Sequence, residues 1–570
     1  TIKNATIAIE DRQFYNHPGF SLTAIARAAR ETYFNKHLQG GSTITQQLVK
    51  NSLLTSEISY WRKAREVVLA FWAEQLYTKN EILEMYFNQV PYGGTAWGIE
   101  AAAENFFGKR VQDLSLAESA YLAGLPAAPT FYSPYGTHPE MAKVRQIEVL
   151  RRMVEDGYIT QTQADVAQKE TITVKPQLVP IKAPHFVMYV RELLTRRFGS
   201  RLVDLGGLRV TTTLDMSLQN QVQDVITKEI TQLTGLKVGN GAAIVTNPKE
   251  GEILAMIGSR DYFNTQADGN VNVTLAPRQP GSAIKVVTYA QALEKGLTAA
   301  SIIEDTPVTY PLAGQLPYSP VNYDGKFHGK VTLRNALANS YNIPAVKTLN
   351  QLGLMTVIDL GRKMGITTWN DPSRFGLSLT LGGGEVTLFD MATVYGTIAN
   401  NGDKVDLDPL IKVSDYTGRV YYERAQDSKQ VISPETAFII SDILADNRAR
   451  TQAFGPNSTL VIPGKTVSVK TGTTNDKRDN WTLGFTPYAV VGVWVGNNDN
   501  SPMDPILTSG VTGAAPIWNK IMTLITKDKP DEKPRISNNV VSLPCYGRVE
   551  YFIRGTEPRG GCKPPASPNP

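Results

Sequence analysis

The 570-residue sequence contains only two cysteines, Cys545 and Cys562, both close to its C-terminus. Two cysteines alone cannot build a cysteine-rich metal cluster. An even pair in a segment rich in Pro and Gly is typical of a disulfide bond formed in an oxidising compartment, and two free thiols are the alternative. We favour the disulfide.

The sequence also lacks long hydrophobic runs. No apolar run approaches the ~18 residues that a membrane-spanning helix requires. The longest runs, 67–73 and 489–495, are short enough to be a buried helix and a buried strand. The chain starts with Thr1 and has no signal peptide, so we expect an N-terminal membrane anchor to be absent from it.

Neither charge sign dominates the sequence. The 58 Lys and Arg exceed the 53 Asp and Glu by five, which is too little to indicate a nucleic-acid partner. With 42% hydrophobic residues the composition is that of a globular protein, so disorder and fibrous repeats are excluded. The length predicts two large domains and a small appendage.

Residues 1–172 are predicted to form an all-helical domain. Apolar residues recur at helical spacing over 25–34, 44–54, 60–76, 82–87, 116–125 and 141–156. Prolines at 176, 180 and 184 then indicate a linker region, which we place over 173–238. That region includes a short predicted helix, 186–198, and a β-like run, 208–214.

Residues 239–528 are predicted to form a second domain with an antiparallel sheet flanked by helices. The expected strands are 242–247, 252–258, 467–472, 481–486 and 489–496. Helical segments separate the first two strands from the last three. Residues 529–570 are rich in Lys, Pro and Gly and are predicted to be a small module or tail.

The helical domain carries a first group of candidate functional residues. After Gly40 and Gly41, a capped helix with a polar stripe fits an anionic ligand, and a solvated surface helix is the alternative. Two glutamates in a cleft suit chemistry at a sugar carbon, and each alone is more often a surface residue. The candidates are Glu10, Ser42, Thr43, Gln47, Lys50, Asn51, Arg62, Lys63, Arg65 and Glu66.

Together, the segments 10–19, 40–51, 62–66 and 79–88 resemble the glycosyltransferase domain of bifunctional class A penicillin-binding proteins. The resemblance implies a lysozyme-like helical fold and polymerisation of lipid II into a growing glycan strand. Glu10 would be the general base, and Glu66 would orient donor groups or a metal. Lys50, Arg62 and Lys63 would stabilise the leaving pyrophosphate, whereas Ser42, Thr43, Gln47 and Asn51 would line the donor site.

The same resemblance implies several partners. A divalent cation, Mg²⁺ or Mn²⁺, is compatible with the glycosyltransferase, and moenomycin-type inhibitors would bind its site. Residues 20–38 would lie against the membrane, although an ordinary amphipathic helix fits that composition equally well. The protein would act at the outer face of the cytoplasmic membrane, with other cell-wall synthesis proteins as candidate partners.

Three further motifs indicate serine acyl transfer. They are S-x-x-K at Ser282 and Lys285, S-x-N at Ser340 and Asn342, and K-T-G-T at 470–473. A serine needs a neighbouring base to become a nucleophile, and residues i and i+3 share a helix face, so Lys285 can reach Ser282. Each motif alone is weak, but the three in this order form the penicillin-binding protein signature.

This second resemblance implies a D,D-transpeptidase that needs no cofactor and that β-lactams acylate at Ser282. Lys285 would be the base, Ser340 would relay the proton, and Asn342 would bind the stem-peptide backbone. Lys470 would set the electrostatics of the site. Thr471 and Thr473 would hold the substrate carboxylate, and Gly472 would let the substrate backbone come close.

Other activities remain open from the residues. A glycoside hydrolase also uses two carboxylates, but it would not need the cations at 50, 62 and 63. A monofunctional serine D,D-peptidase, a β-lactamase or a β-lactam sensor with an inactive helical domain would carry the same three serine-site motifs. Shortening of glycans, or rapid hydrolysis of the acyl-enzyme, would favour these alternatives.

Overall fold

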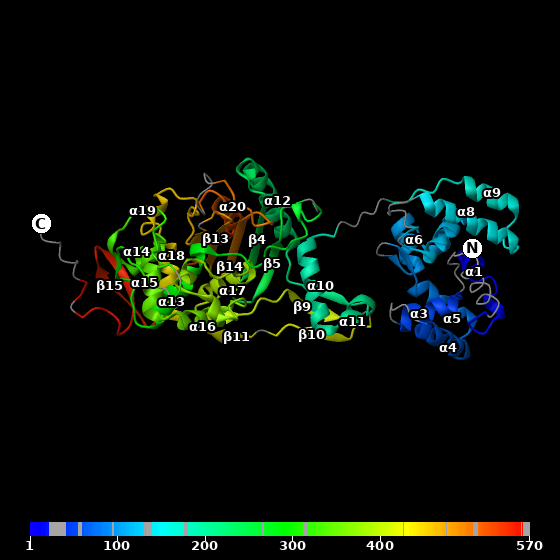
Figure 1. Cartoon of the computed structure of the whole chain (residues 1–570), viewed down its shortest axis with the longest axis horizontal. Coiled ribbons are helices and arrows are strands. Elements are labelled where there is room, and N and C mark those ends of the chain that lie inside the picture. Colours follow the sequence, from blue (N-terminus) through cyan, green and yellow to red (C-terminus); the bar gives the residue numbers. More distant parts are fainter. Residues whose placement is uncertain are drawn as a thin grey trace. The chain divides into compact units, whose positions relative to one another are not determined.

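The computed structural model describes most of the chain. The described residues are 1–21, 42–54, 60–93, 96–129, 131–132, 140–175, 181–264, 267–311, 314, 316–415, 417–425, 427–474, 476–504, 511–559 and 561–562. The chain divides into two compact units, Thr1–Pro180 and Ile181–Pro570 (Figure 1). Most of 20–38, the segment expected to contact the membrane, lies outside the described residues.

The first unit is helical. Its described helices are α1 (Ile2–Glu10), α3 (Ile44–Leu53), α4 (Tyr60–Leu76), α5 (Lys79–Gln89), α6 (Ile99–Phe107), α7 (Leu116–Gly124), α8 (Glu140–Glu155) and α9 (Gln161–Lys169). Short 3-10 turns occur at η1 (Phe14–Asn16), η2 (Val111–Asp113) and η3 (Leu125–Ala127), and β1 (Pro91–Gly93) pairs with β2 (Ala96–Trp97).

Capping explains where several of these helices begin. Thr43, Thr78, Ser115 and Thr160 each accept a hydrogen bond from the backbone three residues on, and the Gln or Glu at that third position bonds back. α1 packs against α7 and α8, and its alanines lie in a core with those of α7. The end of α1 is therefore fixed inside the unit.

The second unit is built on a five-stranded antiparallel sheet, in agreement with the predicted fold class. Its strand order is β12-β13-β14-β4-β5. The strands are β4 (Asn240–Asn247), β5 (Glu252–Ile257), β12 (Ser468–Thr473), β13 (Asp479–Thr486) and β14 (Ala489–Gly496). β12, which carries the K-T-G-T motif, is an edge strand.

Both faces of this sheet are buried, so its strands read as continuous apolar runs. In β14, Val490 and Trp494 face one core, and Val491, Val493 and Val495 face the other. Figure 1 shows α12 and α20 on one side of the sheet and α17 on the other. The helices are α10 (Pro184–Phe198), α11 (Ser200–Leu205), α12 (Met216–Leu233), α13 (Lys285–Glu294), α14 (Leu333–Ala338), α15 (Asn342–Leu352), α16 (Leu354–Met364), α17 (Leu388–Ala399), α18 (Pro434–Ala445), α19 (Thr451–Phe454) and α20 (Ala514–Thr526).

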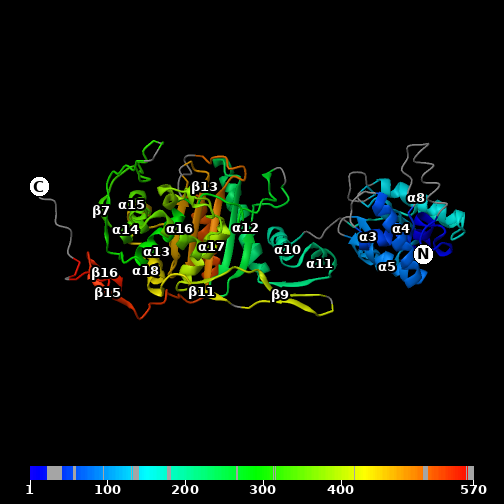
Figure 2. The same cartoon turned by 60° about the horizontal axis from the view of Figure 1, so that its bottom comes forward.

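Smaller β elements complete the second unit (Figure 2). β3 (Arg209–Thr212), β9 (Leu410–Ser414) and β10 (Val420–Glu423) form one sheet. The remaining pairs are β6 (Ile302–Asp305) with β7 (Gly329–Thr332), β8 (Asp403–Val405) with β11 (Ser428–Gln430), and β15 (Val540–Cys545) with β16 (Arg548–Ile553).

The structure shortens the linker expected over 173–238. The second unit begins at Ile181, and α10 and α12 contribute buried residues such as Phe186 and Ile226 to its cores. Pro184 misled the sequence prediction, because it occupies the first turn of α10, where a proline is tolerated.

The C-terminal segment expected as a module or tail contains the β15–β16 hairpin. A disulfide joins Cys545 and Cys562, whose Cα atoms lie 4.9 Å apart. The favoured pairing is thus confirmed. Among the described helices, none is long and apolar enough to cross a bilayer.

Candidate active sites

Glu10, the last residue of α1, is the central carboxylate of the first unit. Gln47 of α3 donates from Nε2 to Glu10 Oε2 at 2.7 Å, and the Tyr86 hydroxyl donates to Gln47 Oε1 at 3.4 Å. Glu10 Oε1 is buried and has no hydrogen-bond partner among the described residues. It is therefore free to accept a proton.

Burial also changes the basicity of this carboxylate. It raises the pKa of Glu10, while the hydrogen bond from Gln47 and the charges of Arg145 and Arg152 oppose the rise. A carboxylate with a raised pKa is a stronger base towards an alcohol.

A second cluster joins the start of α3 to α4. Lys63 donates from Nζ to Ser42 Oγ at 2.7 Å and to Glu66 Oε1. Arg62 Nη1 lies 3.5 Å from Glu66 Oε2, and the Glu66 side chain is only 1% exposed. Four of the predicted residues are thus brought together, with two cations around one buried carboxylate.

The structure separates Lys50 from this cluster's helix terminus. Lys50 is exposed in the last turn of α3, ~9 Å along the axis from Ile44 at 1.5 Å per residue. Asn51, the next residue, is half-buried, and Arg65 is exposed on α4. Lys50 therefore lies at the far end of α3 from Thr43, which caps the helix N-terminus, and its role at the pyrophosphate stays a prediction.

Two residues that the sequence prediction missed hold this site together. Asp11 accepts from the backbone N–H of Ile44 at 3.0 Å and lies 2.9 Å from His17 Nε2. Thr43, besides capping α3, donates from its hydroxyl to Gly19 O at 2.6 Å. Their signal was present, since Asp11 and His17 lie in the recognised 10–19 segment, but the contact with α3 depends on the fold.

A divalent cation would need several oxygen or nitrogen donors placed together. Within the described residues, no group of three His, Cys, Asp or Glu is placed to hold a metal ion. Both Glu66 oxygens face cations instead. The protein residues described here therefore do not form a metal site by themselves.

Ser282 of the second unit lies in a 3-10 turn, η6 (Gly281–Ile284), that leads into α13. Gly281 has φ +54°, and a Cβ there would lie 2.6 Å from the backbone nitrogen of Thr473. Trp481 Nε1 donates to Gln279 O at 2.8 Å, and the Tyr395 hydroxyl donates to Ala283 O at 2.8 Å. The turn is thus held against β12 by the close approach at Gly281, against β13 by Trp481 and against α17 by Tyr395.

Lys285 is fully buried and connects the S-x-x-K and S-x-N motifs. Its Nζ donates to Ser340 O at 2.7 Å, Tyr341 O at 3.1 Å and Asn342 Oδ1 at 2.7 Å. Burial lowers the pKa of Lys285 well below its ordinary value, and the charge of Lys470 lowers it further. A larger neutral fraction makes this amine a suitable base.

Lys470 connects the K-T-G-T strand to the S-x-N motif. Its Nζ donates to Ser340 Oγ and to Thr471 O, both at 2.8 Å. Burial, and then the charge of Arg450, lower the pKa of Lys470 to about 7. Ser340 adopts φ +63°, an uncommon conformation for a residue with a side chain that is typical of functional sites.

The structure adds a packing reason for glycine at position 472 to the predicted approach of the substrate backbone, which stays a prediction. A Cβ at Gly472 would lie 2.1 Å from Pro280 O and 3.0 Å from Ala283 N. The close approach that requires glycine is therefore made by the protein's own turn around Ser282. Thr471 is buried and Thr473 is half-buried at the end of β12.

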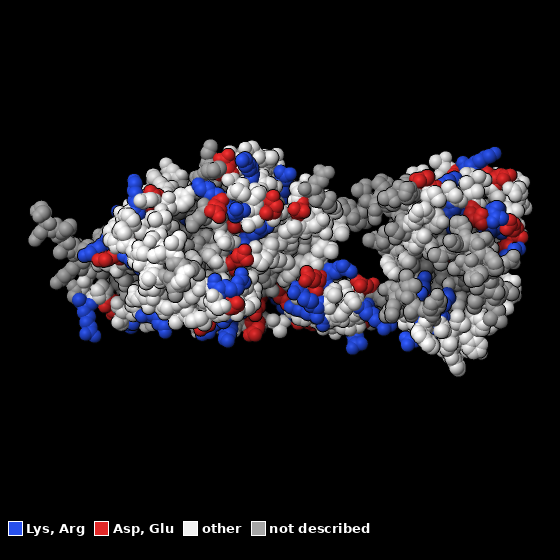
Figure 3. Space-filling view, in the orientation of Figure 1, with Lys and Arg blue, Asp and Glu red and all other residues white. Residues whose placement is uncertain are grey.

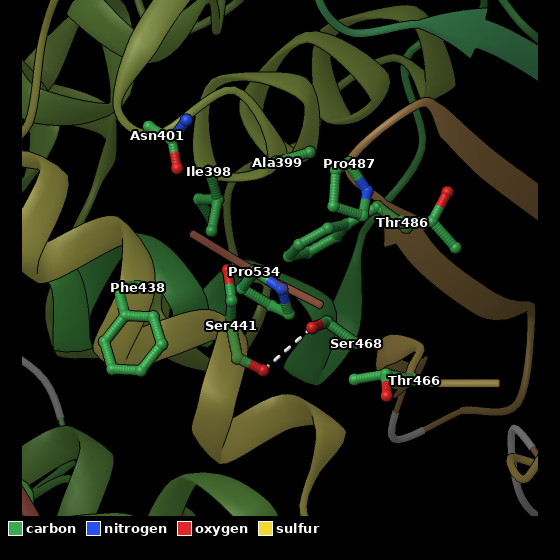
Figure 4. A pocket seen from close by; sticks show the side chains of 11 residues that line it. Ile398, Ala399, Asn401, Phe438, Ser441, Thr466, Ser468, Thr486, Pro487 and Pro534 are labelled. Carbon is green, nitrogen blue, oxygen red and sulfur yellow. Dashed lines mark hydrogen bonds between the residues drawn. The ribbon is translucent and has the colours of Figure 1, made fainter. Parts of the chain in front are cut away.

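A cleft of about 250 Å³ joins these motifs. Its lining residues are Ser282, Tyr323, Asp324, His328, Asn339, Ser340, Tyr341, Asn342, Leu381, Gln452, Ala453, Phe454, Thr471, Thr473 and Val511. Another cavity, lined by Ile398, Ser441 and Ser468 among others, measures about 10 Å³ and holds no more than a water molecule (Figure 4). The cleft thus has room for a substrate.

Known proteins match both units. The family model of the transglycosylases matches residues 1–154, and that of the penicillin-binding protein transpeptidase domain matches residues 241–523. Penicillin-binding protein 1A of Aquifex aeolicus is 34% identical, over 98% of this chain and 88% of that protein. Penicillin-binding protein 2D of Bacillus subtilis is 35% identical, over 99% of this chain and 83% of that protein.

A solved structure shows the same fold. The crystal structure of penicillin-binding protein 1A from Haemophilus influenzae has a TM-score of 0.72 and 23% identity, and the match covers 91% of this chain and 94% of that one. With the two family matches and the close relatives, this chain belongs to the class A penicillin-binding proteins, bifunctional enzymes of cell-wall synthesis with a peptidoglycan glycosyltransferase domain and a D,D-transpeptidase domain.

Proposed function

We propose that the first unit polymerises lipid II with Glu10 as the general base. The observation that carries this proposal is the buried Glu10 carboxylate, held by Gln47 at 2.7 Å with its other oxygen unpartnered among the described residues. The sugar 4-hydroxyl of the acceptor loses its proton to Glu10 and attacks the anomeric carbon of the donor. The bond from that carbon to the pyrophosphate breaks, and undecaprenyl pyrophosphate leaves with inversion.

The cluster around Glu66 is proposed to hold the donor. Lys63 and Arg62 neutralise the charge that develops on the pyrophosphate, and Glu66 keeps both cations in place. Ser42, Gln47 and Asn51 line the donor site, whereas Thr43 acts mainly by capping α3. Lys50, which is exposed, contacts the pyrophosphate only from the outer edge of the site.

A divalent cation and moenomycin-type inhibitors remain proposals for this unit. Mg²⁺ is usually held by few carboxylates together with substrate phosphates. Any bound Mg²⁺ or Mn²⁺ would thus depend on pyrophosphate oxygens, and no step above uses it. Polymerisation measured in EDTA and after adding Mg²⁺ or Mn²⁺ tests this dependence.

The second unit is proposed to cross-link stem peptides through an acyl-enzyme. Lys285 takes the proton of Ser282, whose Oγ attacks the carbonyl between the two terminal D-Ala residues. Ser340 relays the proton to the departing D-Ala, and an amine of a second stem peptide then replaces Ser282 on the acyl carbon. Asn342 binds the peptide backbone, and Thr471 and Thr473 bind the carboxylate beside Lys470.

The charge pattern of the cleft also suits β-lactams, which carry a carboxylate next to a reactive carbonyl. The backbone N–H groups of Ser282 and Thr473 are proposed as the oxyanion hole. Gly281 brings these two segments into direct contact. We expect penicillins to acylate Ser282.

We place the enzyme at the outer face of the cytoplasmic membrane, beside its lipid-linked substrate. On α4, Trp61, Val68, Trp72 and Leu76 are between 56% and 80% exposed, and their spacing puts them on one face. The part of the surface where α4 lies shows few charges (Figure 3). Such a face suits contact with lipid.

Polymerisation of fluorescent lipid II tests the first proposal. Glu10→Gln should reduce glycan formation at least ~100-fold, because it removes the base but keeps the shape. Glu118→Gln is the matched control, since Glu118 is a buried carboxylate that pairs with Lys109 elsewhere in the unit. Shortening of added glycans instead of growth would indicate a hydrolase.

Covalent labelling by a fluorescent penicillin tests the second proposal. The wild type and Ser373→Ala, an exposed serine of the same unit, should be labelled, and Ser282→Ala should not. Labelling that persists in Ser282→Ala would overturn the assignment of the nucleophile.

A further inference from the structure

One part of the transpeptidase cleft is acidic and is not used by the mechanism above. His328 lies between two carboxylates, with Nδ1 2.6 Å from Asp305 Oδ2 and Nε2 3.1 Å from Asp324 Oδ2. Asp305 is fully buried, whereas the Asp324 side chain is 45% exposed. Asp324 and His328 both line the cleft.

This group is attached directly to the S-x-N motif. The His328 ring stacks on Tyr341, the middle residue of that motif, with the ring centroids 4.0 Å apart. Asn322 donates to both oxygens of Asp305 and accepts from the backbone N–H of Asn342 at 2.8 Å. The acidic group therefore keeps a fixed position relative to Ser340 and Asn342.

The negative charge of this acidic group contrasts with the positive charges of Lys285 and Lys470. Lys470 lies on the K-T-G-T strand, where an anionic carboxylate would bind. Lys285 follows Ser282, and the ammonium groups of both lysines contact the S-x-N motif. With a charged imidazolium, the two aspartates and His328 still carry a net charge of −1. The charge of Asp324 also reaches the S-x-N motif, since after burial it is the largest cause of the raised pKa of Tyr341.

We propose that Asp324, positioned by His328 and Asp305, binds the attacking amine of the second stem peptide. A free primary amine is mostly an ammonium ion at neutral pH. Among the described residues that line the cleft, Asp324 offers an exposed carboxylate that can pair with this ion. The bound ammonium releases one proton to solvent. The neutral amine then forms a bond to the acyl carbon, the bond from that carbon to Ser282 Oγ breaks, and the second amine proton passes through Lys285 to Ser282 Oγ.

This subsite acts after the acyl-enzyme has formed, so it rests on the proposed Ser282 chemistry. The two can be measured separately. Penicillin labelling reports acylation alone. The products of a thioester donor ending in acyl-D-alanyl-thioglycolate report whether the acyl group passes to water or to an added nucleophile.

The test uses the whole chain with glycinamide as a cationic amine and methanol as a neutral nucleophile. Asp324→Asn should lower the ratio of aminolysis to hydrolysis about tenfold at a fixed, subsaturating glycinamide concentration. Its methanolysis ratio and its penicillin labelling should stay within twofold of wild type. His328→Phe, which keeps an aromatic ring on Tyr341, should show the same selective loss.

Lys326→Ala is the matched control, because Lys326 is an exposed charged residue of the same loop and does not line the cleft. It should leave all three measurements unchanged. An unchanged aminolysis ratio in Asp324→Asn, or an equal loss of aminolysis and methanolysis, would overturn the proposal. If penicillin does not label the wild-type protein, the proposed Ser282 chemistry is refuted instead.

Discussion

At the scale of single residues, burial and immediate partners decide what each ionisable group does. Glu10 and Glu66 are two carboxylates of one unit with different partners. Glu10 accepts a hydrogen bond from the neutral amide of Gln47, whereas Glu66 pairs with the cations of Arg62 and Lys63. Burial raises the pKa of Glu10. The structure therefore favours Glu10 as the base and Glu66 as the residue that holds the cations.

Replacing Gln47 should make the glycosyltransferase more sensitive to acid. The Gln47 hydrogen bond lowers the pKa of Glu10, so Gln47→Leu should raise that pKa and move the acidic limb of the pH–rate profile to higher pH. Polymerisation should then fall more at pH 6 than at pH 8. An equal loss at both pH values would mean that Gln47 only binds substrate.

Replacing Arg450 should change the pH profile of the transpeptidase. The positive charge of Arg450 lowers the pKa of Lys470, which stands at about 7. Because the Lys470 charge attracts the β-lactam carboxylate, acylation should decline as the pH rises through about 7. In Arg450→Met the decline should move up by roughly one pH unit. Rates of penicillin labelling from pH 5 to 9 measure this, and a fixed alkaline limb would contradict it.

The sequence predicted the motif residues of both sites but not their supporting contacts. The short motifs S-x-x-K, S-x-N and K-T-G-T indicate their chemistry from the sequence alone, and they contain Ser282, Lys285, Ser340 and Lys470. Asp305 and His328 belong to none, because they meet Tyr341 only after β6 and β7 pair. Contacts of that kind depend on the fold rather than on local spacing.

At the scale of elements, the first turns of α3 and the residue before it connect the two clusters of the first unit. Gln47 contacts Glu10, and Ser42 contacts Lys63. Asp11→Ala should remove the acceptor for Ile44 N–H and the partner of His17, costing about 2 kcal/mol. The melting temperature of the first unit should fall by roughly 4–8 °C. Calorimetry can assign the transitions, since bound penicillin shifts only that of the second unit.

Asp165→Ala, at an exposed site on α9, is the control and should leave both transitions in place. If Asp11→Ala melts like wild type, Asp11 does not hold α3.

Helix starts with a capping box could be predicted from the sequence, whereas the interdomain boundary could not. The sequence predicts a capped helix after Gly40 and Gly41, and in the structure Thr43 caps α3 together with Gln46. Pro184 is ambiguous, because a proline fits both a linker and the first turn of a helix. Only the burial of Phe186 and Val190 in the second unit's core decides between them.

At the scale of the whole molecule, the C-terminal hairpin is an integral part of the second unit. Glu550 of β16 accepts from the buried Arg334 of α14 at 2.8 Å, and Arg334 also pairs with Asp442 and Asp446. Glu550→Ala should destabilise the second unit by about 1–3 kcal/mol, because it removes one hydrogen-bonding partner of a buried guanidinium that keeps Asp442 and Asp446. Denaturant unfolding, monitored through the loss of penicillin labelling, measures the stability of the second unit. Unchanged stability would show that the Glu550–Arg334 contact does not stabilise the second unit.

One chain thus carries two active sites with different chemistry, a glycosyltransferase site and a transpeptidase site. The most direct measurement is a single incubation of lipid II with wild type, Glu10→Gln or Ser282→Ala, followed by gel analysis of glycan length and mass spectrometry of cross-links. We expect glycan and cross-links for wild type, neither product for Glu10→Gln, and uncross-linked glycan of normal length for Ser282→Ala. Glycan growth in Glu10→Gln, or cross-links in Ser282→Ala, would contradict it.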